Sequence, residues 1–180
     1  MAVPLAASML LAACGGDAKP GASSSSTSTS SPTTSAPPTT ASPTTDPNIP
    51  VAARAHTPAG AEAFVRYFFD QLNQTWQSPK IGQIARLGLP TCKTCQQYES
   101  AAAGMVSKNQ HYEGEAFSVT SIASLGEAEV LIVGAQEPGK IVASNGSIVE
   151  TKSDTDKAKF IASLDWSTPG WRVAEIRVAK

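Results

Sequence analysis

The sequence is short of the residues and motifs on which most enzyme and metal sites are built. It has three cysteines and two histidines in 180 residues, and no His-Glu-x-x-His, Gly-x-Ser-x-Gly or glycine-rich phosphate motif. Its formal net charge of -1 gives no basic surface of the kind that binds nucleic acid. No apolar run reaches the roughly 20 residues that a membrane-spanning helix needs. These absences favour a binding module over an enzyme, and they predict no metal, no cofactor and no nucleic-acid partner.

The apolar stretch near the N-terminus ends in a short motif that contains a cysteine. Residues 3–11 carry no charge, and they lead into Leu11-Ala12-Ala13-Cys14. This layout is typical of a secretory signal, and the motif resembles the bacterial lipobox, whose cysteine is lipidated before the signal is cleaved. No Lys or Arg precedes Lys19, so the usual basic start of a signal is missing. We expect residues 1–13 to be a signal peptide, and Cys14 to anchor the protein at the extracytoplasmic face of the cell membrane.

Serine, threonine, proline and alanine make up nearly all of residues 21–50. A segment of this composition buries too little apolar surface to offset the entropy lost on ordering. Residues 14–50 are therefore predicted to be the lipidated cysteine and a disordered linker. Residues 51–180 remain as the folded domain, which is long enough for one hydrophobic core.

Apolar residues at helical spacing predict three helices at the start of this domain. Thr57 is a suitable N-cap for the first helix, and Pro58 fits its first helical position. Its apolar stripe consists of Ala61, Phe64, Val65, Phe68, Leu72 and Trp76. A shorter second helix is expected over residues 78–88, and a third from about residue 91 to residue 107.

Beyond residue 107 the apolar residues alternate, as they do in strands with one buried face. Asn145-Gly146 is a strong signal for a type I′ hairpin turn. The alternation slips between Val173 and Ala174, which predicts a β-bulge or a strand buried on both faces. Three helices followed by antiparallel strands indicate an α+β fold with its helices on one side of the sheet.

Three stretches together resemble an uncharacterised family of exported actinobacterial lipoproteins, defined as a domain of unknown function. They are residues 60–68, the Cys92-x-x-Cys95 motif and residues 170–176. That family is similar to the nuclear-transport-factor-2-like (cystatin-like) cone. The resemblance implies three N-terminal helices packed on a curved antiparallel sheet, with a pocket between helix and sheet. Proteins with this fold include isomerases, dehydratases and binding proteins, so the fold alone does not choose a function.

Cys92 and Cys95 allow three interpretations. A zinc site would need two further Cys or His ligands, which the domain offers only as scattered histidines. A thioredoxin-like redox pair would need a strand leading into the motif, and none is predicted there. A structural disulfide suits an oxidising extracytoplasmic compartment, and we expect it to hold the start of the third helix.

The expected pocket gives rise to three hypotheses of function. In the first it holds an apolar ligand or a segment of an envelope protein, although its aromatic residues also suit an ordinary core. In the second the protein is an isomerase- or hydrolase-like enzyme that uses Tyr67, Asp70 or His111, although Asp70 and His111 also suit an exposed surface. In the third an exposed sheet face binds a partner protein or a second copy as a homodimer. The residues expected to line the pocket or core are Phe64, Phe68, Leu72, Trp76, Phe160 and Trp166.

Overall fold

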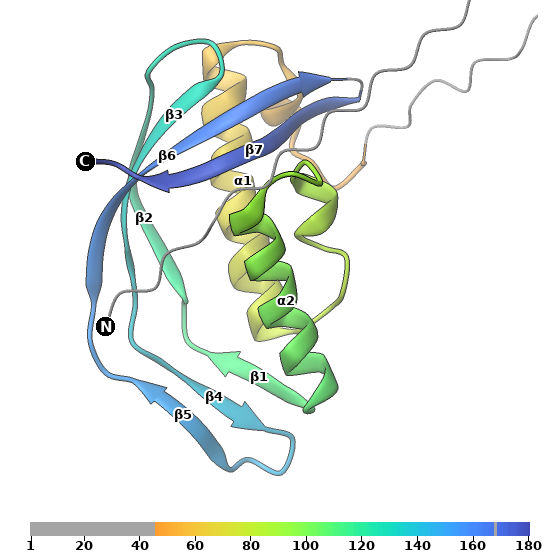
Figure 1. Ribbon diagram of the computed structural model, residues 1–180, viewed down its shortest axis with the longest axis vertical. Coiled ribbons are helices and arrows are strands. Elements are labelled where there is room, and N and C mark those ends of the chain that lie inside the picture. The colour runs from red at the N-terminus through yellow and green to blue at the C-terminus, as the bar shows by residue number, and fades with distance from the viewer. Residues whose placement is uncertain (1–45, 168) are drawn as a thin grey trace, which may run out of the picture. The chain divides into compact units, whose positions relative to one another are not determined.

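Two α-helices lie against one face of an antiparallel β-structure (Figure 1). The structure is a computed structural model, and it describes residues 46–180 except residue 168. The predicted signal peptide, Cys14 and most of the predicted linker lie outside the described residues. The helices are α1 (Pro58–Gln77) and α2 (Lys93–Ser107), and the 3-10 helices η1 (Val51–Arg54) and η2 (Ala85–Leu87) precede them. The predicted α+β class is therefore confirmed.

Helix α1 begins as its sequence predicts. The Thr57 hydroxyl accepts a hydrogen bond from the backbone N–H of Gly60 at 3.1 Å, and Pro58 is the first helical residue. This cap satisfies one of the N–H groups that a helix start leaves without an intrahelical partner. Gly60 also lets the helix approach η1, because a Cβ there would lie 2.0 Å from the carbonyl oxygen of Ala55.

The predicted second helix is wrong, and with it the prediction of three N-terminal helices. Residues 78–88 contain only the three-residue η2, and Gly82 has a positive φ of 88° that does not fit a helix. The loop is held instead by the Glu99 carboxylate, which accepts hydrogen bonds from the backbone N–H groups of Gly82, Ile84 and Ala85. Ile84 and Leu87 are buried in this arrangement.

The strands form two antiparallel sheets. The four-stranded sheet has the order β2-β3-β6-β7, and the three-stranded sheet has the order β1-β4-β5. The strands are β1 (Gln110–Glu113), β2 (Phe117–Ser124), β3 (Glu129–Gln136), β4 (Gly139–Ala143), β5 (Ile148–Lys152), β6 (Asp156–Ser167) and β7 (Gly170–Val178). Strand β1 was not predicted, because its sequence Gln110-His111-Tyr112-Glu113 is mostly polar.

A bend separates the two sheets, and Glu137 lies at it. The chain passes from one sheet to the other between β1 and β2, between β3 and β4, and between β5 and β6. The Glu137 carboxylate accepts hydrogen bonds from the hydroxyls of Ser118 at 2.5 Å and Thr155 at 3.1 Å, and its backbone N–H donates to Ala116. One residue thus links the three places where the strands are interrupted.

Side chains and loops cover parts of both outer strands of the four-stranded sheet. On β2, the Asn73 amide of α1 bonds both the N–H and the C=O of Phe117, at 2.9 and 2.8 Å. At the other end of β2, the Glu62 carboxylate accepts the backbone N–H of Ser124 at 2.8 Å. On β7, the N–H of Leu89 donates to the Val173 carbonyl. The Thr94 hydroxyl donates to the Ile176 carbonyl of the same strand.

The hairpin and the bulge test the strand predictions. Residues 145–146 do connect β4 and β5, but φ is positive at Gly146 and not at Asn145. A type I′ turn needs a positive φ at both, so that turn type was predicted wrongly. The bulge is confirmed: Leu164 pairs with Val173 and Ser163 with Glu175, which leaves Ala174 as the extra residue.

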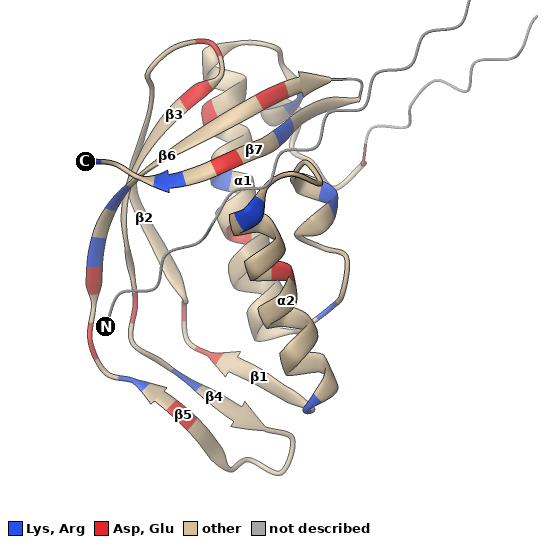
Figure 2. Cartoon of the chain, in the orientation of Figure 1, with Lys and Arg blue, Asp and Glu red and all other residues tan. Residues whose placement is uncertain are grey.

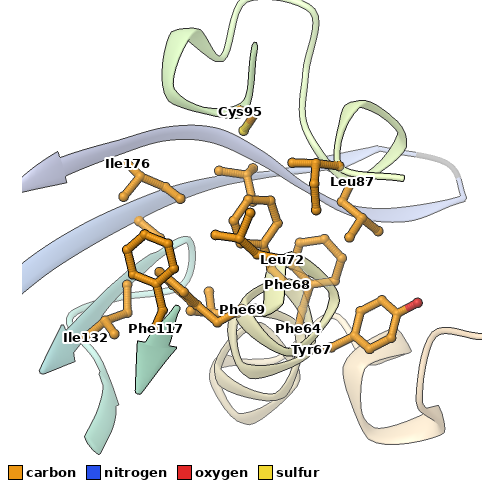
Figure 3. Packing of buried hydrophobic residues seen from close by; sticks show 14 of the residues in the cluster. Phe64, Tyr67, Phe68, Phe69, Leu72, Leu87, Cys95, Phe117, Ile132 and Ile176 are labelled. Carbon is orange, nitrogen blue, oxygen red and sulfur yellow. The ribbon is translucent and has the colours of Figure 1, made fainter. Parts of the chain in front are cut away.

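The core lies between α1 and the four-stranded sheet (Figure 3). Phe64, Phe68 and Leu72 of α1 are at most 1% exposed, and they lie in one cluster with Ile132 and Ile176 of the sheet. Burying each such side chain contributes about 1.5–3 kcal/mol to folding. This cluster fixes α1 across the sheet, and the last turn of α1 then projects toward the smaller sheet.

Candidate functional site

A cavity of about 430 Å³ lies between the C-terminal half of α2 and the β1-β4-β5 sheet. Its size falls within the usual range for small-molecule sites, which is about 300–1,000 Å³. Its walls are mainly apolar. The apolar and aromatic residues lining it are Trp76, Ala101, Met105, Tyr112 and Ile141.

Helix α2 leaves room for the cavity because its facing residues are small. Ala101 and Gly104 stand one turn apart on the cavity wall, followed by the larger Met105. A Cβ placed on Gly104 would meet no heavy atom within 4 Å. The space next to Gly104 is therefore open, and a larger side chain at this position would enter the cavity.

The floor depends on the fit between Tyr112 of β1 and Gly139 of β4. A Cβ at Gly139 would lie 2.2 Å from the Tyr112 hydroxyl oxygen, so glycine makes room for the ring. The Tyr112 hydroxyl donates to the backbone carbonyl of Glu137 at 3.1 Å. Burial raises the pKa of Tyr112 above its usual value of 10, which keeps the hydroxyl protonated as this hydrogen bond requires. The floor is thus joined to the bend between the two sheets.

Trp76, in the last turn of α1, closes one side of the cavity. Its ring lies 5.6 Å from Phe117, 5.9 Å from Tyr98 and 6.2 Å from Tyr112, all measured between ring centroids. Its indole N–H is buried and has no acceptor among the residues that the structure describes. A buried donor without a partner costs about 1–3 kcal/mol. Trp76 therefore brings to the cavity both an apolar ring and an indole N–H that has no acceptor among the described residues.

The structure separates the residues that the sequence suggested for the pocket. Trp76 alone among them lines the cavity, while Phe64, Phe68 and Leu72 lie in the core. Phe160 is half-buried and packs against that core. Trp166 lies on the surface instead, 37% exposed, where it stacks on His56 with ring centroids 4.4 Å apart.

The three catalytic candidates do not meet, and none of them lines the cavity. Asp70 is exposed on α1, and His111 lies on β1 with its Nε2 3.8 Å from a Glu113 carboxylate oxygen. Tyr67 is buried on α1, and its hydroxyl has no partner among the described residues. Burial raises the pKa of Tyr67, an effect that the nearby Arg86 opposes in part. These three candidates therefore form no acid–base pair at the cavity.

The two cysteines of the domain lie at the start of α2. Their sulfur atoms are 2.04 Å apart, at disulfide bonding distance, and both residues are at most 2% exposed. Cys92 is the N-cap, and its sulfur also accepts the N–H of Cys95 at 3.2 Å. Gly88 makes room for the Cys95 sulfur, because a Cβ at residue 88 would lie 2.7 Å from it.

The described part of the chain, residues 46–180 without residue 168, bears on both metal binding and membrane crossing. Over that range, no group of three or more His, Cys, Asp or Glu is arranged to hold a metal ion. Over the same range, no helix combines the length and apolar character needed to cross a membrane.

Residues 46–50, which the sequence suggested as linker, contact the domain: Ile49 packs against the core and Asp46 pairs with Arg86.

Fold and site together define an α+β domain in which two helices cover bent antiparallel sheets and enclose a mainly apolar cavity. The chain belongs to the family of unknown function DUF6318, which it matches over residues 29–177. The expected membership of an uncharacterised family is confirmed. No curated protein matches the sequence.

Several solved structures are similar to this chain. The intermembrane-space region of the chloroplast protein ARC6 is 13% identical, with a TM-score of 0.49, over 67% of this chain and 95% of that one. A domain of unknown function with a cystatin-like fold from Nostoc punctiforme is 14% identical, with a TM-score of 0.44, over 67% and 76%. An uncharacterised protein with a cystatin-like fold from Caulobacter vibrioides is 11% identical, with a TM-score of 0.42, over 67% and 91%.

Proposed function

We propose that this protein is a lipid-anchored binding module of the cell envelope, and that its cavity holds a small, mainly apolar ligand. The cavity carries the proposal, because it has the volume of a ligand site and walls formed by Trp76, Met105, Tyr112 and Ile141. The absence of Tyr67, Asp70 and His111 from its walls removes the residues on which an isomerase or hydrolase was suggested.

Gly104 offers a direct test of the cavity. Gly104→Leu would place an isobutyl group in the open space beside α2, and leucine is also the better helix former by about 1 kcal/mol. The variant should fold and should exclude the ligand. Gln97→Leu is the matched control, since Gln97 is exposed on the same helix and does not line the cavity.

The full chain, extracted from membranes of its own host, should be weighed by native mass spectrometry and then again after denaturation. Extra mass that disappears on denaturation, that persists in Gln97→Leu and that is lost in Gly104→Leu supports the proposal. Bare protein mass in all three samples, together with no binding of added apolar probes, contradicts it.

The anchor rests on the motif Leu11-Ala12-Ala13-Cys14 and has its own test. Denaturing mass spectrometry of the membrane-extracted protein should show a chain that begins at Cys14 and carries diacylglyceryl mass. A chain that still begins at Met1, or an unmodified Cys14, contradicts the anchor and the assigned location. Association with a second copy remains a prediction, which sedimentation of the full chain at high concentration tests.

A further inference from the structure

The charged residues around the cavity balance one another. Lys108, at the end of α2, and Glu150, on β5, are both exposed and both line the cavity. Neither lies within 4 Å of an opposite charge among the residues described. The third charged residue of the lining, Lys152, forms an ion pair with Asp156, with Nζ and Oδ2 2.5 Å apart. Figure 2 shows acidic and basic residues together on β5.

Uncharged polar groups complete the lining. Ser100, Gln110 and Gln136 contribute a hydroxyl and two amides, which donate and accept hydrogen bonds without adding charge. An anion drawn to Lys108 would share the cavity with the unpaired Glu150 carboxylate, and a cation drawn to Glu150 would share it with Lys108. Because like charges repel, either kind of ligand loses on one side what it gains on the other.

We infer that the ligand carries no net charge: it has an apolar body and neutral hydrogen-bonding groups, and it is neither an anion such as a fatty acid nor a cationic amphiphile. This inference rests on the proposed function, because it describes the occupant of the same cavity. The balance between Lys108 and Glu150 is the feature that carries it.

Two fluorescent probes with a common aromatic skeleton allow the test. N-phenylnaphthylamine is neutral, and anilinonaphthalene sulfonate adds one negative charge to the same rings. Both should be titrated into the full-length protein, the Gly104→Leu variant and the charge variants Lys108→Gln and Glu150→Gln. Glu127→Gln is the control, since Glu127 is exposed and does not line the cavity.

The neutral probe should bind more tightly than the sulfonate, and Gly104→Leu should abolish its binding. Glu150→Gln should tighten binding of the sulfonate about two- to fivefold, and Lys108→Gln should weaken it by a similar factor, as expected for exposed charges. The neutral probe should respond to neither change. Tighter binding of the sulfonate to the unmodified protein, or a sulfonate affinity that ignores both variants, overturns the inference. If neither probe binds, the cavity proposal itself fails and this inference falls with it.

Discussion

Asn73 is the residue whose replacement tests most directly how α1 is attached to the sheet. Its side-chain amide donates to the Phe117 carbonyl at 2.8 Å and accepts the Phe117 N–H at 2.9 Å. Asn73→Ala removes both partners at once. Phe117 is only 7% exposed, so water replaces them poorly. Each unsatisfied group costs about 1–3 kcal/mol, and because both hydrogen bonds are only partly buried we expect the two together to cost about 2–4 kcal/mol of unfolding free energy.

Urea denaturation followed by circular dichroism measures this loss, since the unfolding free energy falls linearly with denaturant and an unchanged slope shows that the variant exposes the same surface on unfolding. For a domain of this size the same loss should lower the melting temperature by roughly 10 °C. Asp70→Ala is the control on the same helix, because Asp70 is exposed, and it should change stability by at most about 0.5 kcal/mol. An Asn73→Ala variant as stable as this control would refute the role assigned to the two hydrogen bonds.

Four further predictions concern other residues. Gly104→Ala should raise the unfolding free energy by about 0.5–1 kcal/mol, since alanine favours helix and the added methyl has open space. Gly134→Ala should lower it by more than about 1 kcal/mol, because its Cβ would lie 2.2 Å from the Ser118 carbonyl oxygen; equal thermal melts of the two variants would contradict at least one of these two predictions. Glu99→Ala should cost about 1–2 kcal/mol in urea and should increase amide exchange in residues 82–85, whose three N–H groups lose their acceptor. Burial raises the pKa of Tyr98, so the folded state holds this proton to higher pH than the unfolded state, and stability should fall as pH rises above about 10. Tyr98→Phe should reduce that fall, and an unchanged pH profile would argue against it.

The sequence predicted correctly the features that depend on residues close together in the chain. The cap formed by Thr57 and Pro58, the apolar stripe of α1 and the bulge at Ala174 each follow from a spacing that one element carries by itself. The helix predicted over residues 78–88 failed because a distant carboxylate, that of Glu99, takes the N–H groups that a helix would have used. No pattern within residues 78–88 indicates that Glu99 takes these N–H groups.

The resemblance implied a pocket between helix and sheet, but most of the residues that line the cavity escaped prediction, for a related reason. Phe64 and Phe68 were expected to line the pocket or core, and they fill the core. The cavity lies where α2 has the small Ala101 and Gly104. A small residue in a helix is consistent with either close packing or open space, and only the position of β1 and β4 decides between them. Strand β1 itself shows little alternation, because Tyr112 is its one buried residue.

The covering of β2 and β7 has a consequence for how this domain can associate with other chains. Open sheet edges are where folded domains join one another into polymers, and here Asn73, Glu62 and Thr94 occupy backbone groups on those two strands. Strand β5, at the edge of the smaller sheet, has five residues, faces a register shift in its pairing with β4 and carries charged side chains. Short, irregular and charged edges pair poorly with other chains. The covered backbone groups of β2 and β7 are therefore closed to strand pairing with a second chain.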